Sequence, residues 1–159
     1  GGFNTTFAYK GFSVSAFFEF KVGSYICLLN EHSYLNSDGK EMQMNQMASA
    51  LNYWKKPGDM GVNPKPIAGN STSSATALSD RWLERGDYLR IKDVTLSYAL
   101  PQKALDKLHV KGLRFYVSGL NLYCFNDVNF WDPEMGVTGT GAGVYPLTKS
   151  FVGGVELSF

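Results

Sequence analysis

The sequence predicts an all-β chain of about five antiparallel strands, of the kind that crosses a membrane as part of a β-barrel. Three observations support this prediction. Apolar and polar residues alternate in several segments, and aromatic residues gather on the apolar side. Several segments reach the roughly 9–11 residues that cross a bilayer at a tilt, whereas strands of soluble sheets usually have about 5–6. Short and long connections alternate along the chain, as they do in outer-membrane barrels.

The chain is long enough to form one folded domain. It has 159 residues, a net charge of +1 and 14% aromatic residues. No basic face or run stands out, so no nucleic-acid partner is expected. Mean hydropathy is -0.16, and no stretch approaches the roughly 20 apolar residues of a spanning helix. Because the chain starts at Gly1 without a methionine or a signal peptide, and within or just before a strand, we expect a fragment or a C-terminal piece of a longer protein.

Residues 3–10 and 12–22 are predicted to form the first two strands, joined by a tight turn. Gly11 between them can adopt the positive φ that such a turn requires. Phe17 is the one exception to the alternation in the second strand. The apolar sides of the two strands are formed by Phe3, Phe7, Tyr9, Phe12, Val14, Ala16, Phe18, Phe20 and Val22. This aromatic-faced pair is the strongest sign of membrane strands that alternation alone provides.

The strand pattern fades in a long connection, from about Gly23 to Arg85. Cys27 to Leu29 is a candidate extension of the second strand. A short helix is expected at residues 41–54, because Met44, Met47, Ala48, Leu51 and Trp54 recur at helical spacing. Packing is a more common role for such a stripe than binding. Pro and Gly residues and a polar run then break regular structure, and connections of this length usually mean function or disorder.

Residues 87–100 and 113–125 are predicted to be the third and fourth strands. In the third strand Leu89 and Ile91 occupy positions of the polar side, which either a β-bulge or a rise of the strand above the membrane would explain. Pro101 lies near the start of a short helical turn, residues 101–110, that forms the connection to the fourth strand. A Gly-rich loop follows the fourth strand. If the C-terminus is periplasmic, counting strands places both long loops outside the cell.

The last segment, residues 150–159, alternates again and ends on Phe159. Its apolar side includes Phe151, Val155 and Leu157, with Val152 as the exception on the polar side. A soluble edge strand that ends in phenylalanine fits these ten residues as well as a membrane strand does. A C-terminal strand ending in phenylalanine also resembles the segment by which outer-membrane barrels are recognised for assembly.

No cofactor, metal or catalytic site is predicted. Cys27 and Cys124 could pair or stay apart, and two cysteines make no disulfide framework. The two histidines lack ligand-like spacing to either cysteine. There is no nucleophile elbow and no phosphate loop. Asp132 and Glu134 lie on a Gly-rich loop that gives an acid–base pair no fixed separation. We therefore do not expect an enzyme.

More specific motifs accompany this alternation. They are FAYKGFSVSAFFEF (7–20), RWLERGDYLRIKDVTLSYALP (81–101), LRFYVSGLNLYCF (113–125), DPE (132–134), YPL (145–147) and FVGGVELSF (151–159). Together they resemble the C-terminal region of SusC/RagA-type TonB-dependent outer-membrane transporters of Bacteroidetes. The resemblance implies that residues 1–159 are the closing strands of a large single-chain β-barrel. The plug domain and most strands would then be absent, since the smallest such barrels need about eight strands.

The resemblance also implies a function in the bacterial outer membrane. Such transporters import nutrients, for example glycans, oligosaccharides or peptides. A SusD-like lipoprotein forms their lid, and the TonB complex supplies energy through the N-terminal part that is missing here. The lipid bilayer and the barrel assembly machinery are further implied partners, the latter through Phe151, Val155, Leu157 and Phe159. The alternative is a self-contained β-rich binding or adhesion module without transport activity, which would be a water-soluble monomer.

Two groups of residues are candidates for contact with a transported ligand. Those expected to face the barrel lumen are Glu19, Lys21, Asp93, Arg114, Tyr116 and Glu156, with Ser13, Ser15, Thr95, Ser97 and Ser118. Their simplest role is a solvated barrel wall. Those expected in the second outer loop are Trp131, Asp132 and Glu134, whose aromatic and carboxylate groups suit a sugar or the lid. Packing within the loop is the simpler role for Trp131.

Overall fold

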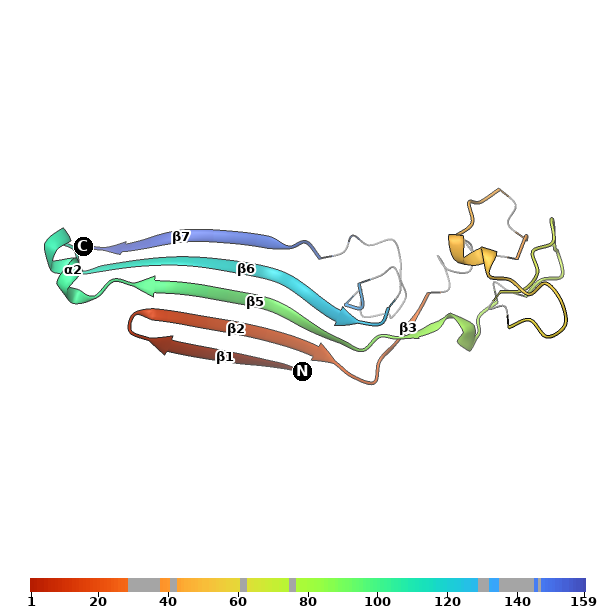
Figure 1. The fold of residues 1–159 in the computed structure, drawn as a ribbon, viewed down its shortest axis with the longest axis horizontal. Helices are drawn as coiled ribbons and strands as arrows, with labels where there is room; N and C mark the ends of the chain where they lie inside the picture. Colours follow the sequence, from red (N-terminus) through yellow and green to blue (C-terminus); the bar gives the residue numbers. More distant parts are fainter. Residues whose placement is uncertain are drawn as a thin grey trace. The chain divides into compact units, whose positions relative to one another are not determined.

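The computed structural model describes residues 1–28, 38–40, 43–60, 63–74, 77–128, 132–134, 145 and 147–159. They form two compact units. Unit 1 combines Gly1–Ser24, Gly86–Asp127 and Pro146–Phe159, and unit 2 combines Tyr25–Arg85 and Val128–Tyr145. All the long strands belong to unit 1 (Figure 1).

Unit 1 is one antiparallel sheet of five strands in the order β1-β2-β5-β6-β7 (Figure 1). The strands are β1 (Gly2–Tyr9), β2 (Phe12–Lys21), β5 (Tyr88–Ala99), β6 (Gly112–Asn126) and β7 (Ser150–Ser158). Every strand that the alternation predicts is present, and neighbours along the chain are neighbours in the sheet. The predicted all-β, antiparallel class is therefore confirmed.

The turn between β1 and β2 depends on a glycine. Lys10 and Gly11 have φ values of 46° and 88°, the left-handed values of a two-residue hairpin turn. A Cβ on Gly11 would lie 2.6 Å from Ala99 O, and Ala99 N donates to Gly11 O at 2.8 Å. The tight turn predicted at Gly11 is thus confirmed, and contact with β5 leaves no room for a side chain there.

A β-bulge at Lys92 explains the irregular parity of the third strand. In β2–β5 pairing Phe18 lies opposite Ile91 and Phe17 lies opposite Asp93, so the register skips Lys92. The β5–β6 register is also irregular at this level, between Ile91 and Asp93. The extra residue moves Ile91 and the residues before it by one position, which brings Leu89 and Ile91 onto the aromatic face. The predicted bulge is confirmed.

The connection from β5 to β6 is the short helix α2 (Gln102–Leu108), as predicted for residues 101–110. Pro101 precedes it in an extended conformation, and His109 ends it with a left-handed φ of 55°. Its Leu105 side chain is buried. Within the described part of the chain, every helix is too short or too polar to cross a membrane.

One face of the unit 1 sheet is apolar and exposed. Residues paired across strands point to the same side, which defines this aromatic face. Its large exposed side chains are Phe3, Phe7, Tyr9, Phe12, Val14, Phe20, Leu89, Leu96, Phe115, Val117, Tyr123, Phe125, Phe151, Val155 and Leu157. Phe7 is 71% exposed and Phe151 is 75% exposed, so no described element covers them. A continuous apolar surface of this kind marks an interaction with lipid or protein.

The aromatic face has aromatic residues toward both ends of the strands. Near α2 the rings of Phe12 and Tyr98 lie 4.3 Å apart between centroids. Toward the other end Phe3 stacks on Phe18 at 4.6 Å. From Phe12 to Phe20 the strand rises by roughly 26 Å at about 3.3 Å per residue. At a tilt of roughly 40° that rise is about 20 Å of height, close to the roughly 25 Å apolar band of a membrane barrel.

Unit 2 has little regular structure. Strand β3 (Tyr25–Cys27) pairs antiparallel with β4 (Leu83–Arg85), so Cys27 belongs to a separate short strand and does not prolong the second strand. The 3-10 helices η1 (Ala48–Leu51) and η2 (Asp80–Trp82) complete the regular elements. Ile26, Leu28 and Trp82 are buried and form the apolar centre of the β3–β4 region.

The prediction of a helix at residues 41–54 is wrong. Residues 41–42 lie outside the described ranges, and residues 43–54 contain only the single turn of η1. Met47 before it is extended and caps nothing, and Asn52 O accepts a hydrogen bond from Asn63 N at 3.1 Å. This bond to a distant residue takes the place of the next helical turn. Met44, Met47, Ala48 and Leu51 of the apolar stripe line a cavity.

Candidate functional site

The face opposite the aromatic face is polar, and it is the candidate site. Cross-strand register pairs Glu19 with Arg90, Lys21 with Tyr88 and Arg114 with Glu156. The six residues expected to face a barrel lumen lie on this face, and their contact with a lumen stays a prediction: Glu19, Lys21, Asp93, Arg114, Tyr116 and Glu156. The structure thus groups them on one surface, which we call the polar face.

The centre of the polar face is a row of hydroxyl groups. The Ser13 and Ser97 hydroxyls lie 2.7 Å apart, and those of Thr95 and Ser118 lie 2.5 Å apart. Thr95 Oγ1 also donates to Asp93 Oδ1 at 3.1 Å. Each hydroxyl therefore has a cross-strand partner, so the row stabilises the sheet and leaves few groups for a ligand.

A charged cluster lies on the polar face near the bulge. Tyr88 donates its hydroxyl proton to Glu19 Oε1 at 2.9 Å, and Lys92 Nζ lies 3.3 Å from Glu19 Oε2. Arg90, opposite Glu19 in the register, is only 3% exposed. The alternation of the sequence does not place Tyr88, Arg90 and Lys92 on this face. A bulge placed directly after Ile91 would predict this cluster, because it puts the side chains of residues 88 and 90 on the polar face.

A second polar group lies at the other end of the strands, on β6 and β7. Arg114 Nη1 lies 3.1 Å from Glu156 Oε2, and the Arg114 guanidinium lies 5.9 Å from the Tyr116 ring centroid. The Tyr116 ring covers Gly154, where a Cβ would lie 2.5 Å from its hydroxyl. Both charged side chains are well exposed. Arg114, Tyr116 and Glu156 therefore form one exposed group, separate from the cluster around Glu19.

The loop candidates belong to unit 2. Trp131 lies outside the described residues. Asp132 Oδ1 accepts a hydrogen bond from Glu134 N at 3.1 Å, so the aspartate closes its own turn. Contact of Asp132 or Glu134 with a ligand or lid stays a prediction.

The terminal residues expected to guide barrel assembly lie at an accessible surface. Phe151, Val155 and Leu157 are on the aromatic face of β7, and Phe159 follows it, all exposed. Within the described ranges there is no cluster of side chains able to hold a metal ion. Neither Cys27 nor Cys124 takes part in a disulfide.

Comparison with known proteins gives relatives over nearly the whole chain. No family model matches. TonB-dependent receptor P3 of Formosa agariphila is 28% identical over 169 residues, which cover 99% of this chain and 16% of the receptor. TonB-dependent receptor P26 of the same organism is 25% identical, with the same coverage. The chain therefore spans about a sixth of the length of these relatives.

Solved structures of a peptide importer have the same fold over the length of this chain. The RagAB peptide importer in its open-open state matches with a TM-score of 0.81, 29% identity and 100% coverage of this chain. Its closed-closed state matches with a TM-score of 0.82 and 30% identity. Over its whole length the chain resembles SusC/RagA-type TonB-dependent transporters. Its sheet is thus a segment of a large antiparallel transmembrane β-barrel of the bacterial outer membrane. The chain covers 17% of each solved protein, and these relatives are named as receptors and importers, not enzymes.

Proposed function

We propose that residues 1–159 are the C-terminal strands and two outer loops of an active importer of nutrients. In this proposal the plug domain and most strands lie in the rest of a longer protein. The observation that carries it is the similarity of this whole chain to about a sixth of the RagAB peptide importer, at 29–30% identity and TM-scores of 0.81–0.82. Glycans, oligosaccharides and peptides are the substrate classes in view, and the name of that importer favours peptides.

The two faces of the sheet support an orientation in the barrel. The aromatic face meets lipid, since its exposed side chains are apolar and aromatic residues lie toward both ends of the strands. The polar face meets the lumen, where Glu19, Arg114 and Glu156 lie beside water. The hydroxyl row and the ion pairs link neighbouring strands of that wall. An adhesion module in water is less favoured, because it would leave the aromatic face uncovered.

The partners follow from this placement. A SusD-like lipoprotein closes over the outer loops, and the TonB complex acts through the N-terminal part of the longer protein. The exposed apolar residues of β7, which pairs with β6, are the contact for the barrel assembly machinery. The lipid bilayer covers the aromatic face.

Uptake by intact cells tests the proposal. Cells that lack the gene are compared with wild-type cells for uptake of labelled oligopeptides and labelled oligosaccharides, with and without an ionophore that collapses the proton-motive force. We expect cells that lack the gene to lose uptake of either the oligopeptides or the oligosaccharides. Wild-type cells treated with the ionophore should lose uptake of the same substrate. Unchanged uptake of both classes would refute the importer function. Energy-independent residual binding would instead support the adhesion module.

A further inference from the structure

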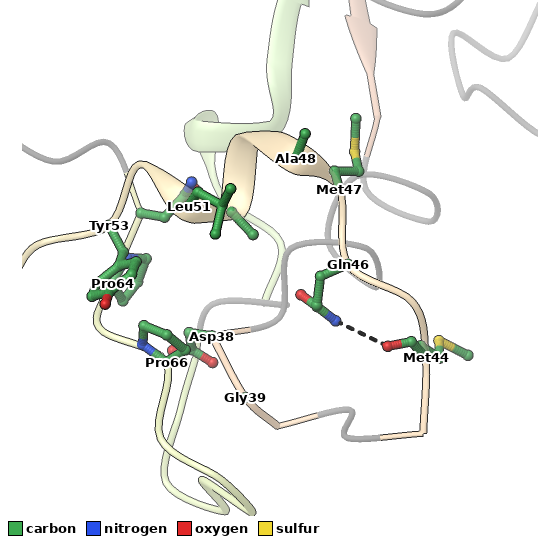
Figure 2. A pocket seen from close by; sticks show the side chains of 12 residues that line it. Asp38, Gly39, Met44, Gln46, Met47, Ala48, Leu51, Tyr53, Pro64 and Pro66 are labelled. Carbon is green, nitrogen blue, oxygen red and sulfur yellow. Dashed lines mark hydrogen bonds between the residues drawn. The ribbon is translucent and has the colours of Figure 1, made fainter.

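Unit 2 contains a cavity of about 430 Å³ that the proposed function does not use (Figure 2). Figure 2 shows side chains surrounding it on several sides, from η1, from the Pro64 to Pro66 segment and from the chain around Met44. Its apolar walls are provided by Met44, Met47, Leu51, Tyr53, Pro64 and Pro66. A site of this size with mostly apolar walls and one or two polar groups is typical of small-molecule or side-chain binding.

Hydrogen bonds fix the walls of the cavity before any ligand arrives. Ile67 N donates to Asp38 O and Gly69 N donates to Gly39 O, both at 3.0 Å. A Cβ on Gly39 would lie 2.3 Å from Ile67 O, so the two segments are in close contact. On another side Asn63 Nδ2 donates to Ser49 O at 2.8 Å, which holds η1 in place. The cavity is therefore largely preformed.

One acidic group lines this apolar cavity. Asp38 is nine-tenths buried, with 9% of its surface exposed, and belongs to the lining. Ser73 Oγ donates to Asp38 Oδ2. Asp38 Oδ1 is buried and has no hydrogen-bond partner among the residues that the structure describes. A buried carboxylate oxygen without a donor is costly, so it favours a ligand that brings one.

The charge of Asp38 acts on Arg81, but the Arg81 side chain is engaged elsewhere. Its Nη2 donates to Asn63 Oδ1 at 2.8 Å, and its guanidinium lies 4.6 Å from the Trp82 ring centroid. Burial lowers the pKa of Arg81, and the negative charge of Asp38 partly opposes this effect. Arg81 therefore moderates the negative potential of the cavity but donates no proton to Asp38 Oδ1.

We propose that this cavity binds a primary ammonium group carried on an apolar chain, as in a lysine side chain. The alkyl chain lies against Met47, Leu51 and Pro64, and the ammonium pairs with the Asp38 carboxylate. A charge-assisted hydrogen bond in a partly desolvated site favours this ligand over an uncharged one of the same shape. Binding of the ammonium group at this site does not require transport.

Methyl NMR on the full-length transporter in lipid nanodiscs tests the proposal. Methionine methyl groups are labelled with carbon-13, and the signals of Met44 and Met47 are assigned by M44L and M47L variants. Two blocked tripeptides are titrated, N-acetyl-Gly-Lys-Gly-amide and the same peptide with norleucine in place of lysine. We expect both methyl signals to shift with the lysine peptide, and its Kd to be about tenfold or more below that of the norleucine peptide.

Two variants make the result specific. Asp38→Asn keeps an acceptor for Ser73 but removes the charge, and it should abolish the preference for lysine. Asp80→Asn removes an exposed carboxylate of unit 2 that is outside the cavity lining, and it should keep the preference. Equal affinity for both peptides, an unchanged preference in Asp38→Asn, or silent Met44 and Met47 signals would each overturn the proposal. These readouts do not depend on import, so failed uptake would leave them intact.

Discussion

A charge placed on the aromatic face should destabilise the transporter, whereas the same charge on the polar face should not. Val117 and Val152 form a matched pair for this test. Val117 lies on the aromatic face of β6 with 49% exposure, and Val152 lies on the polar face of β7 with 45% exposure. The two lysine substitutions therefore differ chiefly in the face that receives the charge.

The expected magnitude follows from the position of Val117 between the aromatic ends. A lysine on the lipid face costs about 2–4 kcal/mol at the bilayer midplane and about 0–1 near the interface. Val117 is one cross-strand row from the central row that contains Val94 and Gly119. We therefore expect Val117→Lys to cost about 2 kcal/mol, roughly a thirtyfold shift in the folding equilibrium. Val152→Lys should change the free energy of unfolding by less than about 0.5 kcal/mol.

The assay is urea unfolding of the full-length protein in lipid vesicles, followed by tryptophan fluorescence and by the heat-modifiable band on a gel. The amount of each variant in the outer membrane of cells gives a second readout. Equal stability of the two variants, or greater loss with Val152→Lys, would refute the assignment of the aromatic face to lipid.

Four further predictions concern single residues. Gly11→Ala should destabilise by roughly 1–3 kcal/mol because of its φ of 88° and the nearby Ala99 carbonyl, as urea unfolding would measure. Tyr88→Phe should cost about 1.5–3 kcal/mol through the lost bond to Glu19, whereas Tyr98→Phe on the aromatic face should not, and equal losses would contradict this. Arg114→Ala should cost less than about 1 kcal/mol, since its ion pair is exposed. Trp131→Ala should weaken uptake or lid binding, and unchanged transport would exclude a ligand role.

The sheet could be predicted from the sequence because its signal is local. A strand shows its two faces with a period of two, so Phe12, Val14 and the residues that follow reveal the aromatic face without any knowledge of pairing. Even the bulge was visible as a change of parity at Leu89 and Ile91. Its position was not, and the charged cluster of Tyr88, Arg90 and Lys92 was missed for that reason.

The long connection could not be predicted in the same way. The stripe from Met44 to Trp54 has helical spacing, yet only Ala48–Leu51 forms a turn. The deciding bonds come from Asn63, a residue far along the chain, and spacing within the stripe carries no information about them. The unpartnered Oδ1 of Asp38 likewise depends on three segments that meet only in the folded unit.

The central claim is that this chain is part of a much longer outer-membrane transporter. An immunoblot of fractionated cells, with an antibody raised against residues 129–144, tests it most directly. We expect a heat-modifiable band in the outer-membrane fraction, several times larger than the 17.6 kDa of this chain. A band near 17.6 kDa in the soluble fraction would mean that the strands pack in water, and it would contradict the account.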